Sequence, residues 1–230
     1  MKTIGLIGGM SWQSTIPYYR IINETVARTL GGFHSAKIIL WSIDFADMEE
    51  LQRTGQWEES GLQLTEVARK LETAGADVLV IGTNTMHIVA DQIEAGIGIP
   101  LLHVADATAA AVLEAGARTV GLLGTRFTME KEFYRHRLES HGLSVVIPEE
   151  ADRAEVHRVI YDELVLGRIE EPSRVAYRRV VADLVARGAE AIIFGCTEIG
   201  LLIDQSDSSV PVFDTTTIHA QAAARFAIET

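Results

Sequence analysis

The feature that most constrains the fold of this chain is an internal duplication of three segments. TIGLIGGM at residue 3 is echoed by TVGLLGTR at residue 119, AGADVLVIGTNT at 74 by RGAEAIIFGCTE at 187, and GIPLLHVADATAAA at 98 by SVPVFDTTTIHAQA at 209. The second copies start 116, 113 and 111 residues after the first. Such a steady offset indicates two similar halves, each of which folds as its own unit.

Each half alternates short apolar runs with helix-like stretches of about 12 to 18 residues, which is typical of parallel strands joined by helical crossovers. We therefore predict an α/β protein with two similar lobes, each a mostly parallel sheet flanked by helices. The lobes are expected to be related by a pseudo-twofold, with the active site between them. The predicted lobes are 1–105 plus 214–230, and 106–213. The predicted strands are 3–8, 36–43, 77–82, 100–104, 119–124, 144–148, 190–195 and 210–213.

One helix is predicted in detail, over the segment TIPYYRIINETVARTL. Ser14 and Thr15 are its candidate N-caps, and Pro17 falls in the predicted first turn. Two glycines follow the end of the segment, as is common after a helix. Near the other end of the chain, Asp214 is a natural N-cap, and His219 is expected to help the last helix pack on the first lobe.

Composition excludes several classes of protein. The 230 residues are 47% hydrophobic, enough for a substantial core, and no apolar run reaches the roughly 20 residues of a membrane span. Twenty basic residues against 32 acidic ones give a net charge of −12, which disfavours nucleic acid and anionic lipid as partners. One cysteine forms no internal disulfide, and the first residues lack a signal-peptide pattern. We expect a cytoplasmic homodimer that acts on a small molecule.

The single cysteine, Cys196, ends an apolar run in the second half, and the duplication places it opposite Thr83 of the first half. Loops that follow parallel strands usually carry the ligand site, so the two loops are expected to share a cleft. A thiol between a strand and a helix start should have a lowered pKa, because backbone N–H groups and the helix dipole favour the thiolate. Two proton carriers on opposite faces of one carbon would give a two-base racemase. The alternative is that Cys196 is a small buried hydrophobe.

At these residues the chain resembles the aspartate/glutamate racemase superfamily, whose members racemise amino acids without a cofactor. The resemblance covers essentially the whole chain, through IGLIGGMSWQST near the start, TNTMH at 83–87, GLLGT at 121–125, FGCTEIGLL at 194–202 and PVFDTTTIHA at 211–220. The usual first-half motif of that family is Cys-Asn-Thr, whereas this chain has Thr83-Asn84-Thr85. One of the two catalytic cysteines has thus become threonine.

The resemblance implies a role for each matching residue. Cys196 would be the base that acts on the L-enantiomer, and Thr83 would stand in the place of the base for the D-enantiomer. The residues implied to bind substrate are Met10 and Ser11 as pocket lining, Asn84, Thr85 and Thr197 for the α-carboxylate, and Glu198 near the α-ammonium. As alternatives, Asn84 and Thr85 merely cap the next helix, and Glu198 is a favourable acid in a first turn.

The chain departs from the aspartate-preferring relatives where they bind the side-chain carboxylate. Their early arginine loop is not evident here, and the corresponding stretch offers Gln52 and Arg53. Their second-half lysine is replaced by Val165 or Leu166, with Arg168 nearby. Either arginine is a candidate substitute, although most arginines are solvated surface groups. Specificity for acidic substrates is therefore in doubt, and a broad or neutral range is credible.

No cofactor is predicted. The glycines of the first loop do not form G-x-G-x-x-G, so NAD is not expected, no lysine stands in a pyridoxal-phosphate context, and the histidines and carboxylates are too scattered to indicate a metal. His87 either orients the site or packs in the core. Two other functions stay open. One is a decarboxylase of the same superfamily, which keeps only the second-half cysteine, and the other is a non-catalytic amino-acid sensor.

Overall fold

The computed structural model describes residues 1–229, which form two compact units. The first contains residues 1–103 together with the segment from His219 onward, and the second is Val104–Ile218. Each unit has its own four-stranded sheet, and all strand pairs in both sheets are parallel. The predicted α/β class, with two parallel-sheet lobes flanked by helices, is confirmed.

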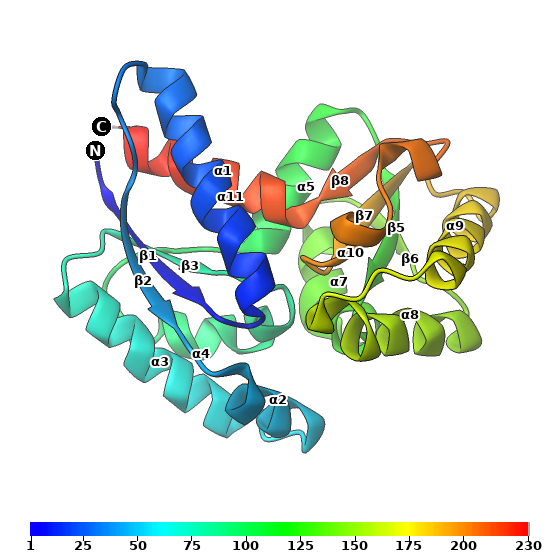
Figure 1. Ribbon diagram of the computed structural model, residues 1–230, viewed down its shortest axis with the longest axis horizontal. Helices are drawn as coiled ribbons and strands as arrows, with labels where there is room; N and C mark the ends of the chain where they lie inside the picture. Colours follow the sequence, from blue (N-terminus) through cyan, green and yellow to red (C-terminus); the bar gives the residue numbers. More distant parts are fainter. Residues whose placement is uncertain (230) are drawn as a thin grey trace. The chain divides into compact units, whose positions relative to one another are not determined.

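The first sheet has the order β2-β1-β3-β4. Its strands are β1 (Thr3–Gly8), β2 (Lys37–Ser42), β3 (Val78–Ile81) and β4 (Leu101–Leu102). The helices that accompany it are α1 (Trp12–Leu30), α2 (Phe45–Arg53), α3 (Trp57–Thr73), η1 (Thr85–Val89), α4 (Ala90–Glu94) and α11 (Thr215–Ile228), the last of which starts in the other unit. Figure 1 shows α1 and α11 on one face of this sheet and α3 on the other. Each face has a separate apolar core, one with α1 and α11 and one with α3 and α4.

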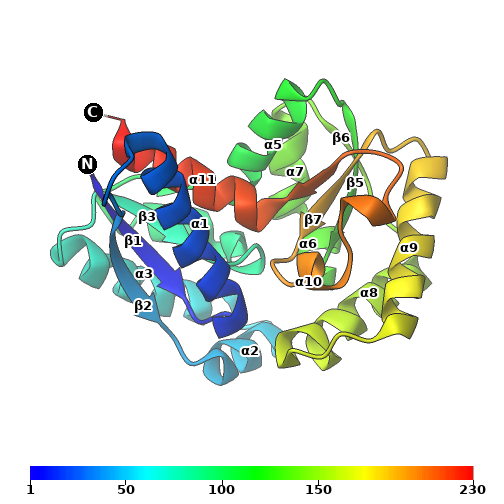
Figure 2. The same ribbon diagram turned by 45° about the horizontal axis from the view of Figure 1, so that its top comes forward.

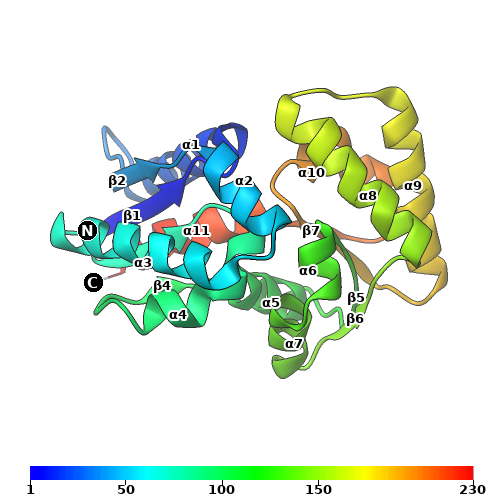
Figure 3. The ribbon, with the colours of Figure 1, turned by 90° about the horizontal axis from the view of Figure 1, so that it is seen from below.

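The second sheet repeats this arrangement with the order β6-β5-β7-β8. Its strands are β5 (Thr119–Gly124), β6 (Ser144–Val146), β7 (Ala191–Gly195) and β8 (Val212–Asp214). Its helices are α5 (Val104–Glu114), α6 (Arg126–Glu130), α7 (Glu132–Ser140), α8 (Glu150–Asp162), η2 (Leu164–Leu166), α9 (Glu171–Ala186), α10 (Ile199–Leu202) and η3 (Gln205–Asp207). Figure 2 shows α5 and α7 on one face, and Figure 3 shows α8 and α9 together on the other.

The duplication read from the sequence is therefore present in the topology. β1, β2, β3 and β4 have the same places in the first sheet as β5, β6, β7 and β8 in the second. The predicted strands are all found. β1 and β5 have the predicted bounds, β2, β3, β7 and β8 differ by one or two residues at an end, and the other two strands are clearly shorter than predicted. The strand predicted at 100–104 is reduced to Leu101–Leu102 because Val104 already starts α5, and the strand predicted at 144–148 ends at Val146, ahead of Pro148. Proline lacks the N–H that a sheet ladder needs.

The predicted start of the first helix was wrong. α1 begins at Trp12 with Ser11 as its N-cap, so Ser14 and Thr15 lie inside the helix and Pro17 lies in its second turn. Both hydroxyls donate to the Ser11 carbonyl, over 2.8 and 3.1 Å, and Thr15 Oγ1 also accepts the Gly9 N–H over 2.8 Å. These hydroxyls serve the loop from within the helix. The predicted cap at Asp214 is confirmed, since its carboxylate accepts the Thr216 N–H and the Thr217 hydroxyl.

The first loop after β1 depends on a glycine. Gly9 has φ of 89°, in the left-handed region, and a Cβ added there would lie 2.2 Å from the carbonyl oxygen of Ile43 and 2.6 Å from its nitrogen. Both neighbours are backbone atoms and have little freedom to move. The close approach of this loop to the end of β2 therefore requires glycine.

We predict that Gly9→Ala lowers the free energy of unfolding by at least about 3 kcal/mol, because left-handed strain and a backbone clash add together. Gly75 is the matched control, since it has φ of 98° but no heavy atom within 4 Å of the place that an added methyl carbon would take. Gly75→Ala should cost only the conformational strain of about 1 to 2 kcal/mol. Urea unfolding measures both variants, and equal losses would show that the clash at Gly9 is relieved by small shifts.

Candidate active site

The predicted first-half site residues gather at the carboxyl end of the first sheet. Thr83, Asn84 and Thr85 follow β3, and all three are buried. The turn is fixed by the backbone: the Gly82 N–H donates to the carbonyl of Ile7 in β1, over 2.8 Å, and the Thr83 N–H donates back to Ile81, over 2.9 Å. The loop after β3 is thus bonded to the neighbouring central strand.

Met10 and Ser11 follow β1, which is the strand next to β3, and both are buried. Gln52 reaches the same region from α2, where its Nε2 donates to Met86 Sδ in η1 over 3.1 Å. Met10 and Met86 belong to one apolar cluster. All six first-half residues named from the sequence therefore surround the carboxyl ends of β1 and β3, as the rule for parallel sheets predicts.

The second-half site residues follow β7, the strand that corresponds to β3. Cys196 and Glu198 are buried, and Thr197 is partly buried. The Glu198 side chain turns back along the loop, and its Oε2 accepts both the Cys196 thiol, over 3.0 Å, and the Thr197 hydroxyl, over 2.6 Å. The sequence did not predict this thiol–carboxylate pair, because it placed Glu198 only near a substrate ammonium.

The predicted lowering of the Cys196 pKa was wrong. Burial raises the pKa of this thiol well above its ordinary value, and the Glu198 carboxylate raises it further by its charge and by accepting the S–H. Backbone N–H groups of Thr197 and Glu198 act in the opposite sense and are outweighed. The helix that follows, α10, has four residues, so its dipole is small. The resting group is a protonated thiol beside a carboxylate.

The arginines suggested as side-chain ligands lie on the surface. Arg53 ends α2 and forms ion pairs with Glu49 and Glu50, over 3.9 and 3.3 Å, with most of its side chain exposed. Arg168 is exposed in the segment after η2. Arg53 is thus a solvated surface group, as most arginines are.

A cluster of buried histidines lies behind Thr83. His87 Nδ1 is 2.8 Å from the Thr83 carbonyl oxygen, and the His87 ring centroid lies 4.5 Å from that of His103 and 5.7 Å from that of His219. All three are buried. The sequence left His87 open between orienting the site and packing in the core, and it did not single out His103. The available signal was that His87 and His103 each interrupt an apolar run, as in TMHIV and LLHVA.

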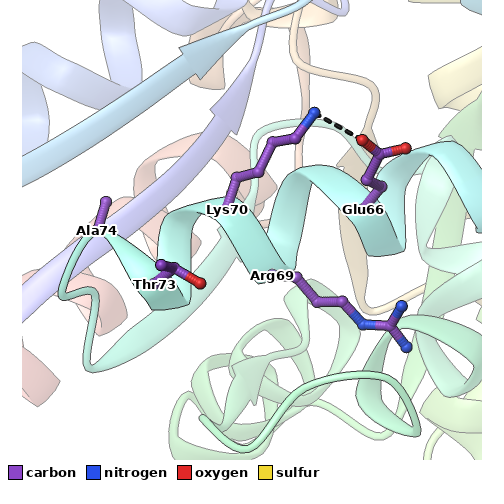
Figure 4. Close-up of a pocket in the computed structure, with 5 residues that line it drawn as sticks. All are labelled: Glu66, Arg69, Lys70, Thr73 and Ala74. Carbon is purple, nitrogen blue, oxygen red and sulfur yellow. Dashed lines mark ion pairs between the residues drawn. The ribbon is translucent and has the colours of Figure 1, made fainter.

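A surface hollow of about 340 Å³ lies elsewhere, on the last turns of α3. Figure 4 shows Lys70 and Glu66 directed to one side of the helix, where they form an ion pair of 2.7 Å, and Arg69 directed to the other. Arg69 Nε donates to the carbonyl of Gly96. Because these charges are satisfied separately and do not converge, the hollow is not assigned to the active site.

Comparison with known proteins agrees with the fold. A model of the Asp/Glu/Hydantoin racemase family matches residues 7–223, and the chain belongs to this family. A Yersinia pestis protein assigned as an Asp/Glu racemase is 59% identical in sequence and superposes with a TM-score of 0.93, with both chains fully covered. An aspartate racemase homologue from Pyrococcus horikoshii is 36% identical, with a TM-score of 0.85 and full coverage of both chains.

Among characterised sequences, the chain is similar to the broad specificity amino-acid racemase RacX of Bacillus subtilis. The two are 22% identical over 229 residues, which is 95% of each chain. No helix within residues 1–229 is long and apolar enough to cross a membrane. Over the same residues, His, Cys, Asp and Glu side chains do not gather in any group of three or more that could hold a metal ion.

The thiol–carboxylate pair leads to a direct prediction. Replacing Glu198 by glutamine removes the negative charge that disfavours the thiolate, so the pKa of Cys196 should fall in Glu198→Gln. Because the chain has one cysteine, the ultraviolet absorbance of the thiolate, taken as the difference from the Cys196→Ala protein so that the tyrosines cancel and followed against pH, reports on this group. The control is Glu139→Gln on the exposed side of α7, which makes the same change in net charge. A titration midpoint that stays in place or rises in Glu198→Gln contradicts the assignment.

Proposed function

We propose that this protein is a cofactor-independent amino-acid racemase in which Cys196 and Thr83 exchange protons with opposite faces of the substrate Cα. Membership of the racemase family supports the reaction class. The observation that carries the assignment is the buried Cys196 thiol bonded to Glu198, at the strand end that corresponds to the Thr83 loop. The proposal includes a cleft that is lined by the Thr83 loop and the Cys196 loop and that binds one substrate molecule.

The pairing of Cys196 with Glu198 gives the thiol a way to become a base. The carboxylate already accepts the S–H, so movement of that proton to Glu198 Oε2 leaves a thiolate and a neutral acid. A substrate ammonium close to the sulfur would stabilise the thiolate that this transfer leaves, because an opposite charge nearby favours the ionised form. In this scheme the zwitterionic substrate itself favours the reactive form of Cys196.

Thr83 serves the other face in this proposal. A threonine hydroxyl can donate and accept a proton but is a far weaker base than a thiolate, so abstraction on its side is slow. Asn84, Thr85 and Thr197 are proposed to bind the α-carboxylate through hydroxyl, amide and backbone donors. Met10, Ser11 and Gln52 are proposed to line the same pocket. Their burial around the ends of β1 and β3 supports these assignments.

The substrate class is proposed to be α-amino acids of broad or neutral side chain. Arg53, one of the two arginines suggested for an acidic side chain, pairs with surface glutamates. Similarity to a broad specificity amino-acid racemase points the same way. The homodimer stays a prediction, to be measured by light scattering in solution.

The two other functions are less well supported. A decarboxylase needs an apolar pocket beside the cysteine for a departing carboxylate, but here the neighbour of Cys196 is the carboxylate of Glu198, which would repel it. A sensor would bind amino acids without exchanging the α-hydrogen. Proton exchange at Cα therefore separates the racemase from both other functions in one measurement.

The test is a survey of α-hydrogen exchange by NMR, with common L-amino acids in deuterated water. We expect exchange with several neutral amino acids, and a loss of about 10² to 10⁴ in rate for Cys196→Ala, since loss of a catalytic base typically costs that much. Circular dichroism checks that the variant is folded. Undiminished exchange in Cys196→Ala would remove this residue from the mechanism, and absence of exchange with every amino acid would rule out the racemase.

Because Thr83 is a weak base, we predict that deuterium exchange at Cα and inversion of Cα proceed at different rates. Racemisation has an equilibrium constant of one, so kcat/KM is equal in both directions whatever the residues are. A weak second base therefore appears as exchange without inversion, when Cys196 returns a proton or deuteron to the face it took one from. We expect an L-substrate in deuterated water to gain deuterium faster than it forms D-product, and Thr83→Cys to narrow this gap. Equal rates in the native protein, unchanged by Thr83→Cys, would show that Thr83 does not limit inversion.

A further inference from the structure

Two histidines of the cluster behind Thr83 make hydrogen bonds from which their tautomers can be deduced. A carbonyl oxygen only accepts, so the 2.8 Å contact to the Thr83 carbonyl requires a proton on His87 Nδ1. By the same reasoning, the 2.8 Å contact between His219 Nε2 and the Leu102 carbonyl requires a proton on Nε2. His219 Nδ1 is then the acceptor for the Tyr18 hydroxyl, at 2.9 Å. The bonds of His219 thus run from Tyr18 in α1 through α11 to the end of β4, and His87 bonds separately to the loop of Thr83.

This cluster also lies where the backbone passes from one unit to the other. The backbone leaves the first unit after His103 and returns to it at His219, and the rings of both residues contact that of His87. His103 directly follows β4, and His219 lies within α11. His87 therefore packs against both residues at which the backbone crosses between the units, and its ring is hydrogen-bonded to the loop that contains Thr83.

The ring of His87 is kept neutral in this position. Burial lowers its pKa well below the ordinary value, and the neighbouring His103 and His219 lower it further, while the carbonyls of Thr83 and Leu102 act weakly in the other direction. Burial also lowers the pKa of His219 to about 4. A neutral His87 with its proton on Nδ1 is a fixed donor to Thr83 and not an acid or base for the substrate.

We propose that His87 is a positioning residue for inversion: its Nδ1–H holds the Thr83 main-chain carbonyl, and thereby fixes the Thr83 hydroxyl relative to the substrate. The inference rests on the proposed racemase function and adds a residue to it. His87 acts only through Thr83, so it matters for the step that Thr83 serves and not for exchange by Cys196. A role in stability alone would affect both steps together.

The experiment compares two substitutions of His87 by the ratio of inversion to deuterium incorporation. His87→Asn keeps an N–H donor on the atom bonded to Cγ, as Nδ1 of histidine is, whereas His87→Leu keeps the bulk and removes the donor. We expect the ratio to fall about tenfold or more in His87→Leu, since a displacement of about 1 Å can cost up to about 10²-fold in rate. In His87→Asn the ratio should stay within about twofold of the native value, given that the donor is retained.

Tyr18→Phe is the matched control, because it removes the hydroxyl bonded to His219 and leaves the His87 contact with Thr83 in place. It should slow exchange and inversion equally, if at all. An unchanged ratio in His87→Leu, or an equal fall in His87→Leu and His87→Asn, would overturn the positioning role. If the native protein exchanges no α-hydrogen, the racemase proposal itself fails, which is a different result.

A second measurement keeps the inference testable if His87→Leu does not fold. Long-range ¹H–¹⁵N correlation spectra of the native protein distinguish the two neutral tautomers of each histidine. We expect the Nδ1–H form for His87 and the Nε2–H form for His219 at neutral pH. The Nε2–H form, or a charged ring, at His87 would show that it does not hold Thr83 in the way inferred.

Discussion

The need to keep polar groups out of the central strands determines where the chemistry of this protein lies. β3 and β7 are buried along their whole length, and each is covered by helices on both faces. A polar side chain within such a strand would lose its hydration without a partner, at a cost of about 1 to 3 kcal/mol. The proposed reactive groups therefore lie just beyond the strands, Cys196 directly after β7 and Thr83 two residues after the end of β3.

The same constraint explains why the site residues are hydrogen-bonded to one another. Because the strand-end loops are themselves largely buried, each polar group in them needs a fixed partner. Glu198 is a partner for Cys196 and Thr197, and His87 is a partner for Thr83. These pairings fix the protonation states of the loops: Cys196 is a neutral thiol, His87 is a neutral imidazole and Thr83 is a neutral hydroxyl.

The sequence predicted the architecture because the fold depends on patterns that repeat along the chain. Eight apolar runs and their duplication were enough to place the strands, to within a residue or two for most ends, and to align Thr83 with Cys196. The start of α1 was missed because N-cap preference is a local rule, whereas Ser14 and Thr15 donate back to Ser11 from inside the helix. At this place the hydroxyls of Ser14 and Thr15 bond to the loop before α1 and do not cap a helix.

The chemistry of the site was less predictable, because it depends on side chains that meet only in the folded protein. A helix-start argument gave the wrong sign for the Cys196 pKa, since burial and the returning carboxylate of Glu198 outweigh a short helix. His87, His103 and His219 are far apart in sequence and meet only where the chain crosses between its two units.

This difference in sign changes what a racemase of this kind has to do. Under the proposed racemase function, a thiolate present at rest would need only a substrate within reach, whereas a thiol kept neutral by burial and by Glu198 would have to be activated by the molecule on which it acts. An α-ammonium supplies the positive charge that this activation needs, and a neutral ligand without an amine does not. Selectivity for amino acids can therefore arise from the protonation state of Cys196 itself, in addition to the contacts that bind the carboxylate.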